Sequence, residues 1–382
     1  MTRRKIDPKE KKILFITGTR ADFGKIEPLA KAAKKIGFNV GFFITGMHMM
    51  RRYGETRIEV KKFAKEGVFE FFNQREGDSL DYILSKTILG LSDYLQENHQ
   101  DLVVIHGDRI ETLAASVVCG IRNLRSCHIE GGELSGTIDE SIRHCSTKFC
   151  TAHFVSNKEA EKRVLLLGES PDRIFNIGSP ELDMHAVDSG VEIEEVKKRY
   201  EIYFQDYGIV IFHPVTTEID SIKKQAKSLF DALNLSDRNY VVISPNNDPG
   251  SGEIFSIIEQ LPKQRFKIIP SMRFSHFSEL MKNASIMIGN SSAGVREAPF
   301  LGLASINIGT RQNKRVSENQ ICNCNAESIN ELIELVNKNW GVKNRQSEFF
   351  GTGDASIRFL KVIENKSFWE LPIQKSYHEE IL

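Results

Sequence analysis

The chain has 382 residues, of which 40% are hydrophobic and 27% are charged, and its formal net charge at pH 7 is +0. This composition is typical of a folded soluble protein, and the length favours two domains over one. The balanced charge does not indicate binding to nucleic acid or to a membrane surface. It is compatible with a local basic pocket that binds a small anion.

The N-terminal segment and the cysteines indicate a cytoplasmic protein. Residues 1–12 are charged and poor in apolar side chains, so they fit neither a signal peptide nor a membrane span. No stretch of the sequence approaches the roughly 18 consecutive apolar residues of a transmembrane helix. The six cysteines lack Cys-x-x-Cys spacing, which favours free thiols in a reducing compartment over a metal site.

The first half of the chain alternates apolar runs with helical patterns. The runs predict strands at residues 13–17, 39–44, 102–105, 126–129 and 153–156. Helical patterns follow the first and third runs, at residues 26–35 and 114–118. Continuous apolar strands separated by helices indicate a parallel sheet covered on both faces.

The alternation then restarts, with strands predicted at residues 208–212, 240–243, 266–269 and 286–288. The expected fold is α/β, with two doubly wound, Rossmann-like domains that face a cleft. We place the domains at 1–185 and 186–382, with the catalytic groups expected in the first. A helical pattern after Ser356 indicates a terminal helix that crosses back to brace the first domain.

Ionisable side chains cluster where two predicted strands end. His106 and Asp108 follow one strand, and Glu130 and Asp139 lie on the glycine-rich stretch after the next. The carboxyl edge of such a sheet is where ligands bind, and neighbouring carboxylates and imidazoles can share proton transfers. The alternative is a two-metal site. The interleaved basic residues, such as Arg109, favour anion binding with acid–base work and no metal.

The loop after the first strand holds two further candidates, Arg20 and Asp22. It matches neither the Gly-x-Gly-x-x-Gly fingerprint nor a phosphate-binding P-loop, so nothing supports a nicotinamide cofactor. Arg20 suits a diphosphate, because guanidinium pairs with phosphate in a fork, and the alternative is an ordinary surface arginine.

The second half offers candidates of the same kind, at the ends of two strands. His213 follows the strand at 208–212 and is either a site residue or a structural histidine. Ser291 and Ser292 begin a turn of small residues that suits phosphate oxygens, or they are plain helix caps. Glu297 suits ribose hydroxyls, or it complements the helix dipole.

These segments together resemble the hydrolysing UDP-N-acetylglucosamine 2-epimerases of sialic-acid biosynthesis, over nearly the whole chain. The matching motifs are residues 16–24, 45–48, 106–109, 128–144, 178–180, 212–217, 245–248, 289–294 and 309–312. The non-hydrolysing relatives carry a Gly-Thr-Arg-Pro-Glu type of first loop, whereas this chain has Arg20-Ala21-Asp22.

The resemblance implies a glycosyltransferase-B-like fold, with the nucleotide mainly on the second domain. It also implies a two-stage reaction without cofactor or metal. Loss of the sugar C2 proton and of UDP gives 2-acetamidoglucal, and addition of water then gives N-acetylmannosamine. A homodimer is expected from the same family, and the expected small-molecule partner is a nucleotide sugar.

The resemblance also implies roles for individual residues. Asp108, Glu130 and Asp139 match the catalytic carboxylates, and His213 matches the catalytic histidine. Asp108 or Glu130 would be the C2 base, Asp139 would serve water addition or reprotonation, and His213 would assist the leaving diphosphate. The expected substrate-binding residues are Arg20, Asp22, His48, Arg109, Ser291, Ser292, Glu297 and Arg311.

Three alternatives stay open at this point. A sister group of epimerases uses a GDP-linked 2,4-diacetamido sugar in legionaminic-acid biosynthesis and shares nearly all of these motifs. A glycosyltransferase could use the same fold, because fold alone does not fix the reaction. A non-catalytic nucleotide-sugar sensor is disfavoured, because binding an anion does not need so many carboxylates.

Overall fold

A computed structural model describes residues 5–135, 138–187, 189–246, 248–312 and 321–379. Gly136 and Thr137 of the glycine-rich stretch, and Asn247 of the 245–248 motif, lie outside the described residues. The chain divides into two compact units. Unit 1 comprises residues 1–133, 138–186 and 351–382, and unit 2 comprises residues 134–137 and 187–350.

Unit 1 is built around a parallel sheet that has seven strands within its described residues, in the order β3-β2-β1-β4-β5-β6-β7. Its strands are β1 (Lys12–Thr17), β2 (Asn39–Ile44), β3 (Val68–Glu70), β4 (Leu102–His106), β5 (Ser126–Ile129), β6 (Ala152–Val155) and β7 (Ile174–Asn176). The strand order reverses direction between β1 and β4, so the loops after these two strands diverge there and leave room for a ligand.

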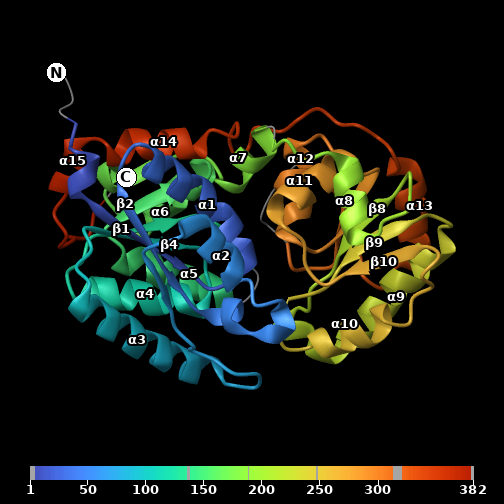
Figure 1. The fold of residues 1–382 in the computed structure, drawn as a ribbon. Coiled ribbons are helices and arrows are strands. Elements are labelled where there is room, and N and C mark those ends of the chain that lie inside the picture. The colour runs from blue at the N-terminus through green and yellow to red at the C-terminus, as the bar shows by residue number, and fades with distance from the viewer. Residues whose placement is uncertain (1–4, 136–137, 188, 247, 313–320, 380–382) are drawn as a thin grey trace. The chain divides into compact units, whose positions relative to one another are not determined.

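Helices cover both faces of this sheet, as Figure 1 shows. They are α1 (Arg20–Lys35), α2 (Arg57–Ala64), α3 (Leu80–Glu97), α4 (Ile110–Ile121), α5 (Ile138–Phe149), α6 (Lys158–Leu166), α7 (Glu181–Ala186), α14 (Ala355–Ile363) and α15 (Lys366–Glu370). One face packs α1, α2, α14 and α15 around Phe15 and Phe154, and the other packs α3 and α4 around Leu14 and Phe43. Alternate strand residues point to opposite faces, so a sheet buried on both sides needs the continuous apolar runs of the sequence.

Unit 2 repeats this plan with a parallel sheet that has six strands within its described residues, in the order β10-β9-β8-β11-β12-β13. Its strands are β8 (Gly208–Ile211), β9 (Tyr240–Ile243), β10 (Phe266–Ile269), β11 (Ile286–Gly289), β12 (Ser305–Ile308) and β13 (Ile321–Cys324). Its helices are α8 (Ile193–Tyr200), α9 (Ile222–Leu235), α10 (Ser251–Ile258), α11 (Phe274–Lys282), α12 (Glu297–Phe300) and α13 (Ile329–Asn339). Here the strand order reverses between β8 and β11. The two doubly wound sheets confirm the predicted α/β class.

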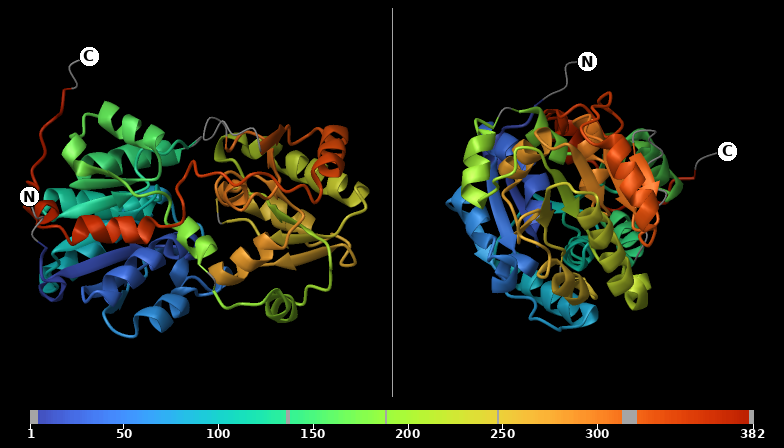
Figure 2. Two further views of the ribbon diagram at one scale, coloured as in Figure 1. Left: turned by 90° about the horizontal axis from the view of Figure 1, so that it is seen from above. Right: turned by 90° about the vertical axis from the view of Figure 1, so that its right-hand side faces the viewer.

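The last described segment of the chain lies on unit 1. Figure 2 shows α14 and α15, in red, on the same sheet face as the blue α1. Glu169 fixes the tail beyond them, because its carboxylate takes the ammonium of Lys375 at 2.8 Å and the imidazole of His153 at 3.0 Å. Burial alone would raise the pKa of Glu169, but His153, Lys375 and Lys148 together lower it to about 2.

The structure differs from the sequence prediction at α1, which begins at Arg20 and not near residue 26. Thr19 caps the helix, since its hydroxyl accepts a hydrogen bond from the Asp22 backbone N–H, and the Thr19 backbone N–H donates one to the Asp22 carboxylate. This reciprocal cap satisfies N–H groups that a helix start leaves without partners, so the helix begins inside the loop.

None of the helices in the described residues is long and apolar enough to cross a membrane.

Gly289, the last residue of β11, lets the strand approach its neighbour closely. Its φ is +130°, and a Cβ placed on it would lie 1.9 Å from the carbonyl oxygen of Ile211 on β8. Only glycine fits this geometry, so we expect Gly289→Ala to destabilise the fold by at least about 2 kcal/mol in urea unfolding. Gly252 on α10 has no atom within 4 Å of such a Cβ, and Gly252→Ala should be neutral or stabilising. Equal stability of the two variants would contradict this account.

Candidate active site

The loop between β1 and α1 is held together by Asp22. Its carboxylate accepts hydrogen bonds from the backbone of Gly18 at 2.9 Å and of Thr19 at 3.2 Å, and from the Thr17 hydroxyl. Burial raises the pKa of Asp22, while the charge of His106 and these hydrogen bonds lower it in part. Asp22 therefore shapes the loop at the end of β1.

His48 lies behind this loop as a fully buried histidine. Its Nε2 is 2.9 Å from the Thr17 hydroxyl, and its Nδ1 is 2.7 Å from the Thr56 hydroxyl. Burial and the nearby Arg20 charge lower the pKa of His48 to about 3. A neutral imidazole with both nitrogens occupied ties the loops after β1 and β2 together.

Arg20 is paired with Glu59 of α2 in this structure. Its Nε donates to Oε2 of Glu59 at 2.8 Å, and its Nη2 binds Oε1. A substrate diphosphate could bind this guanidinium only in competition with Glu59 or alongside it, because the bidentate pair uses both donors of one fork edge.

Arg143 of α5 links Asp108 to Glu130. One guanidinium nitrogen binds the carboxylate of Asp108, and the other donates to the backbone carbonyl of Glu130 at 2.6 Å. Arg143 is buried, whereas the side chain of Asp108 keeps 20% of its exposure. Asp139 is half-buried and lies one helical turn before Arg143, so the two share a face of α5. Arg143 thus contacts the Asp108 carboxylate and the Glu130 backbone, and Asp139 lies on the same helix.

Glu130 is the most constrained residue of the group. Its φ of 62° is left-handed, which for a residue with a side chain carries strain of about 1–3 kcal/mol. Its Oε2 lies 3.2 Å from both Lys25 Nζ and His106 Nε2, and its Oε1 accepts the Ser179 hydroxyl at 2.7 Å. This buried carboxylate is thus held by three side chains that come from three different segments of the chain.

His128 is structural. Its Nε2 is 2.7 Å from the carbonyl oxygen of Gly107, and its Nδ1 is 3.0 Å from the Thr147 hydroxyl. Burial lowers the pKa of this histidine to about 3, with nearby charges adding to the effect. It fixes the turn that carries Asp108.

In unit 2, Asn290 organises the end of β8. Its side chain accepts the His213 backbone N–H at 2.7 Å and donates to the His213 carbonyl at 2.8 Å. Nδ1 of His213 accepts the backbone N–H of Asn246 at 3.1 Å. Burial and the Arg311 charge lower the pKa of His213 well below its usual value, so the ring is neutral and its proton sits on Nε2.

Two of the remaining unit 2 candidates, Ser291 and Arg311, lie next to the same asparagine. Arg311 Nη1 donates to the Asn290 carbonyl at 3.3 Å. The hydroxyl of Ser291 accepts the Ala293 backbone N–H at 3.3 Å, so Ser291 is a local cap, and Ser292 begins the short turn that follows. Glu297 is buried in the first turn of α12. Unit 2 thus brings His213, Ser291 and Arg311 to the point where the strand order reverses.

Several residues of the site were missed by sequence reasoning. Lys25 contacts both Glu130 and Glu181, and Glu111 lies beside Arg109, with 3.7 Å between its Oε2 and the Nε of Arg109. Lys25 directly precedes the helical pattern at 26–35 and Glu181 follows a proline, so neither position carried a spacing signal. No group of three or more His, Cys, Asp or Glu side chains able to hold a metal occurs in the described part of the chain.

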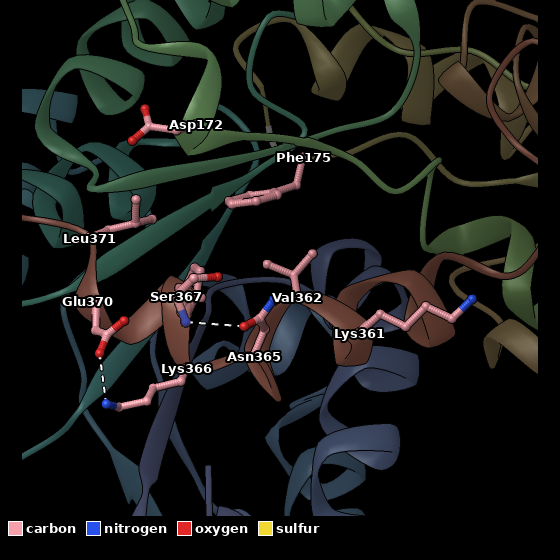
Figure 3. A pocket seen from close by; sticks show the side chains of 10 residues that line it. Asp172, Phe175, Lys361, Val362, Asn365, Lys366, Ser367, Glu370 and Leu371 are labelled. Carbon is pink, nitrogen blue, oxygen red and sulfur yellow. Dashed lines mark hydrogen bonds and ion pairs between the residues drawn. The ribbon is translucent and has the colours of Figure 1, made fainter. Parts of the chain in front are cut away.

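A cavity of about 720 Å³ in unit 1 lies away from all these groups, between β7 and the helices α14 and α15 (Figure 3). Phe175, Val362 and Leu371 form its apolar wall, and Lys366 on its rim pairs with Glu370 at 2.9 Å. None of the candidate residues lines it.

Comparisons with known proteins agree on one family. Residues 30–364 match the family model described as UDP-N-acetylglucosamine 2-epimerase. The chain is 41% identical to the UDP-N-acetylglucosamine 2-epimerase of Neisseria meningitidis serogroup B, covering 96% of this chain and 98% of that protein. It is 30% identical to the UDP-N,N'-diacetylbacillosamine 2-epimerase (hydrolyzing) of Legionella pneumophila, covering 93% and 96%. A crystal structure of UDP-GlcNAc 2-epimerase from Neisseria meningitidis, bound to UDP-GlcNAc, has the same fold, with a TM-score of 0.77, 20% identity and coverage of 92% and 98%.

The neutral state of His48 predicts a pH-dependent stability. The unfolded chain protonates this histidine below about pH 6.5, but the folded protein does so only near pH 3, so stability falls as the pH drops between these values. We expect His48→Gln to lower the stability at pH 7 and to flatten its fall between pH 6 and 4 by up to about 1.4 kcal/mol per pH unit. Urea unfolding at several pH values measures this slope. The exposed His99 offers the control His99→Gln, which should leave the slope unchanged, and an unchanged slope in His48→Gln would contradict the account.

Proposed function

The chain belongs to the UDP-N-acetylglucosamine 2-epimerase family, and on this premise we propose that it is the hydrolysing enzyme, which converts UDP-N-acetylglucosamine and water into N-acetylmannosamine and UDP. The observation that supports this most is the set of candidate carboxylates in unit 1, and above all Glu130. Its backbone is strained, and its buried carboxylate is held by three side chains. A strained residue that its surroundings over-determine is typical of a catalytic site.

In the first stage the C2–H bond breaks, its electron pair forms the C1–C2 double bond, and UDP departs with the electrons of its bond to C1. Asp108 or Glu130 takes the C2 proton. This proton is weakly acidic, so the base must be well oriented and the leaving diphosphate stabilised. Arg143 holds the carboxylate of Asp108 and the backbone carbonyl of Glu130, while Lys25, His106 and Ser179 orient the carboxylate of Glu130.

The neutral His213 assists the leaving diphosphate. Its Nδ1 is occupied by the Asn246 backbone, so Nε2 carries the proton and is the donor that remains for a phosphate oxygen. Arg311, Ser291 and Ser292 supply further donors in unit 2. Arg20 and Arg109 are the phosphate-binding donors proposed in unit 1. Glu297 accepts ribose hydroxyls in this scheme.

In the second stage Asp139 serves water addition at C1 or protonation at C2. Protonation from the opposite face inverts C2 and yields the manno product. No residue is oxidised or reduced, so the chain's own acid–base groups suffice for the proposed chemistry.

The same chemistry on a GDP-linked 2,4-diacetamido sugar is the second candidate. The Legionella pneumophila enzyme, 30% identical to this chain, is named for the UDP-linked sugar UDP-N,N'-diacetylbacillosamine, so it supports the diacetylated sugar but not the GDP. The 41% identity to the Neisseria meningitidis enzyme favours UDP-N-acetylglucosamine. A cytoplasmic location is part of the proposal. All six cysteines are free thiols in the structure, which suits a reducing compartment.

Removing either carboxylate tests the proposal. We expect Asp108→Asn and Glu130→Gln to reduce UDP release from UDP-N-acetylglucosamine by about 10²–10⁴-fold, because each takes away an acid–base group. Asp231→Asn, which changes a half-exposed carboxylate on α9, is the control and should retain full activity. UDP release at the wild-type rate by both site variants would contradict the proposed roles.

We also propose a homodimer. Tyr82 and Leu89 lie seven residues apart on α3, so they share one helix face, and they are 50% and 63% exposed. Light scattering coupled to size-exclusion chromatography should give twice the chain mass of 43.4 kDa for the wild type and a single chain mass for Leu89→Glu. A monomeric wild type would contradict the dimer.

A further inference from the structure

The turn after the β7 strand brings one side chain to the carboxylate of Glu130 and a second to the lysine that faces this carboxylate. This turn, residues 178–181, carries Ser179 and Glu181 on either side of Pro180. The Ser179 hydroxyl donates to Oε1 of Glu130 at 2.7 Å. Glu181 binds the ammonium of Lys25 at 2.8 Å, and the same ammonium lies 3.2 Å from Oε2 of Glu130. One ammonium therefore bridges a candidate catalytic carboxylate and a second carboxylate.

Burial makes these contacts strong. The side chains of Glu130 and Glu181 are 3% and 1% exposed, and that of Lys25 is 14% exposed. Charges interact several times more strongly in such surroundings than in bulk water. A change of charge at Glu181 therefore changes the electrostatic potential at Lys25 and at Glu130.

The turn is anchored independently of Glu181. Asp183, two residues further on, accepts the backbone N–H groups of Ala355 at 2.8 Å and Ser356 at 2.7 Å. These are groups that the start of α14 would otherwise leave without partners. Because Asp183 fastens the turn to α14, the position of Ser179 and Glu181 does not depend on the Glu181 charge alone.

We propose that Ser179 and Glu181 are positioning residues for the epimerase reaction, an inference that rests on the proposed function. Ser179 fixes one oxygen of Glu130 and stabilises its anion. Glu181 holds the Lys25 ammonium in place, and its negative charge partly offsets the positive charge of Lys25 at Glu130. Glu130 is therefore a better proton acceptor than it would be beside Lys25 alone.

Other charged groups face the same point. His106 reaches Glu130 from β4, and Arg143 binds the Glu130 backbone from α5 while pairing with Asp108. Asp22 of α1 interacts with His106. Variants at Ser179 and Glu181 leave all of these groups unchanged, so a change in pH dependence can be attributed to the turn residues.

The two residues predict opposite effects on the pH profile of kcat/KM. Glu181→Gln removes a negative charge, so nearby groups lose their protons more readily and the acid limb moves to lower pH by about half a unit or more. Ser179→Ala removes a hydrogen bond to the anion, so the acid limb moves to higher pH. In both variants kcat falls about tenfold or more while KM changes less, and Glu181→Asp, which keeps the charge, restores part of kcat.

A buried carboxylate elsewhere in unit 1 provides the matched control. Glu169 is as buried as Glu181 and binds Lys148, Lys375 and His153 near the tail. Glu169→Gln should lower thermal stability without moving the acid limb. If Glu181→Gln also loses stability but keeps the wild-type limb, Glu181 is only structural and the proposal is overturned.

A second measurement separates this inference from the proposed function. If wild-type protein acts on neither nucleotide sugar, the proposed function fails, and the turn is then judged by NMR of protein labelled with ¹³C at lysine Cε. The Lys25 signal, assigned with Lys25→Arg, should lose its proton at lower pH in Glu181→Gln than in the wild type. Identical titration of that signal in both proteins would overturn the inference.

Discussion

The left-handed turn at Glu130 is the constraint on which the rest of unit 1 depends. β5 ends at Ile129, and the next residue must turn so that its carboxylate meets Lys25, His106 and Ser179 at once. These three partners come from α1, β4 and the turn after β7. The hydrogen bonds of Glu130 offset its backbone strain. Because these bonds come from elements far apart in sequence, all of these elements must be correctly placed before the carboxylate is held.

Unit 2 uses a different device for the same purpose. The side chain of Asn290 is an uncharged amide, and it forms hydrogen bonds with both the backbone N–H and the backbone carbonyl of His213. Gly289, directly before it, allows the close approach of β11 to β8 that makes this possible. His213 is therefore neutral, and its proton is on Nε2. A neutral ring with a fixed N–H donor suits hydrogen bonding to a phosphate oxygen.

Much of this could be predicted from the sequence, because strongly apolar strands such as 240–243 and 266–269 were found at their observed positions. The short strands β3, β7, β12 and β13 were not predicted, since polar residues such as Glu70, Asn176 and Asn307 interrupt their apolar pattern. Motifs predicted Asp108, Glu130 and His213 as site residues, but not Lys25 or Glu181. Their importance lies in contacts between distant segments, which residue spacing does not encode.

The central claim is that this chain removes and replaces the C2 hydrogen of UDP-N-acetylglucosamine. The most direct test is proton NMR of the purified protein with this sugar in deuterated buffer, with a chelator and no added cofactor. The account predicts free N-acetylmannosamine that carries deuterium at C2, together with UDP. Product that retains hydrogen at C2, or transfer of the sugar without any C2 exchange, would contradict it.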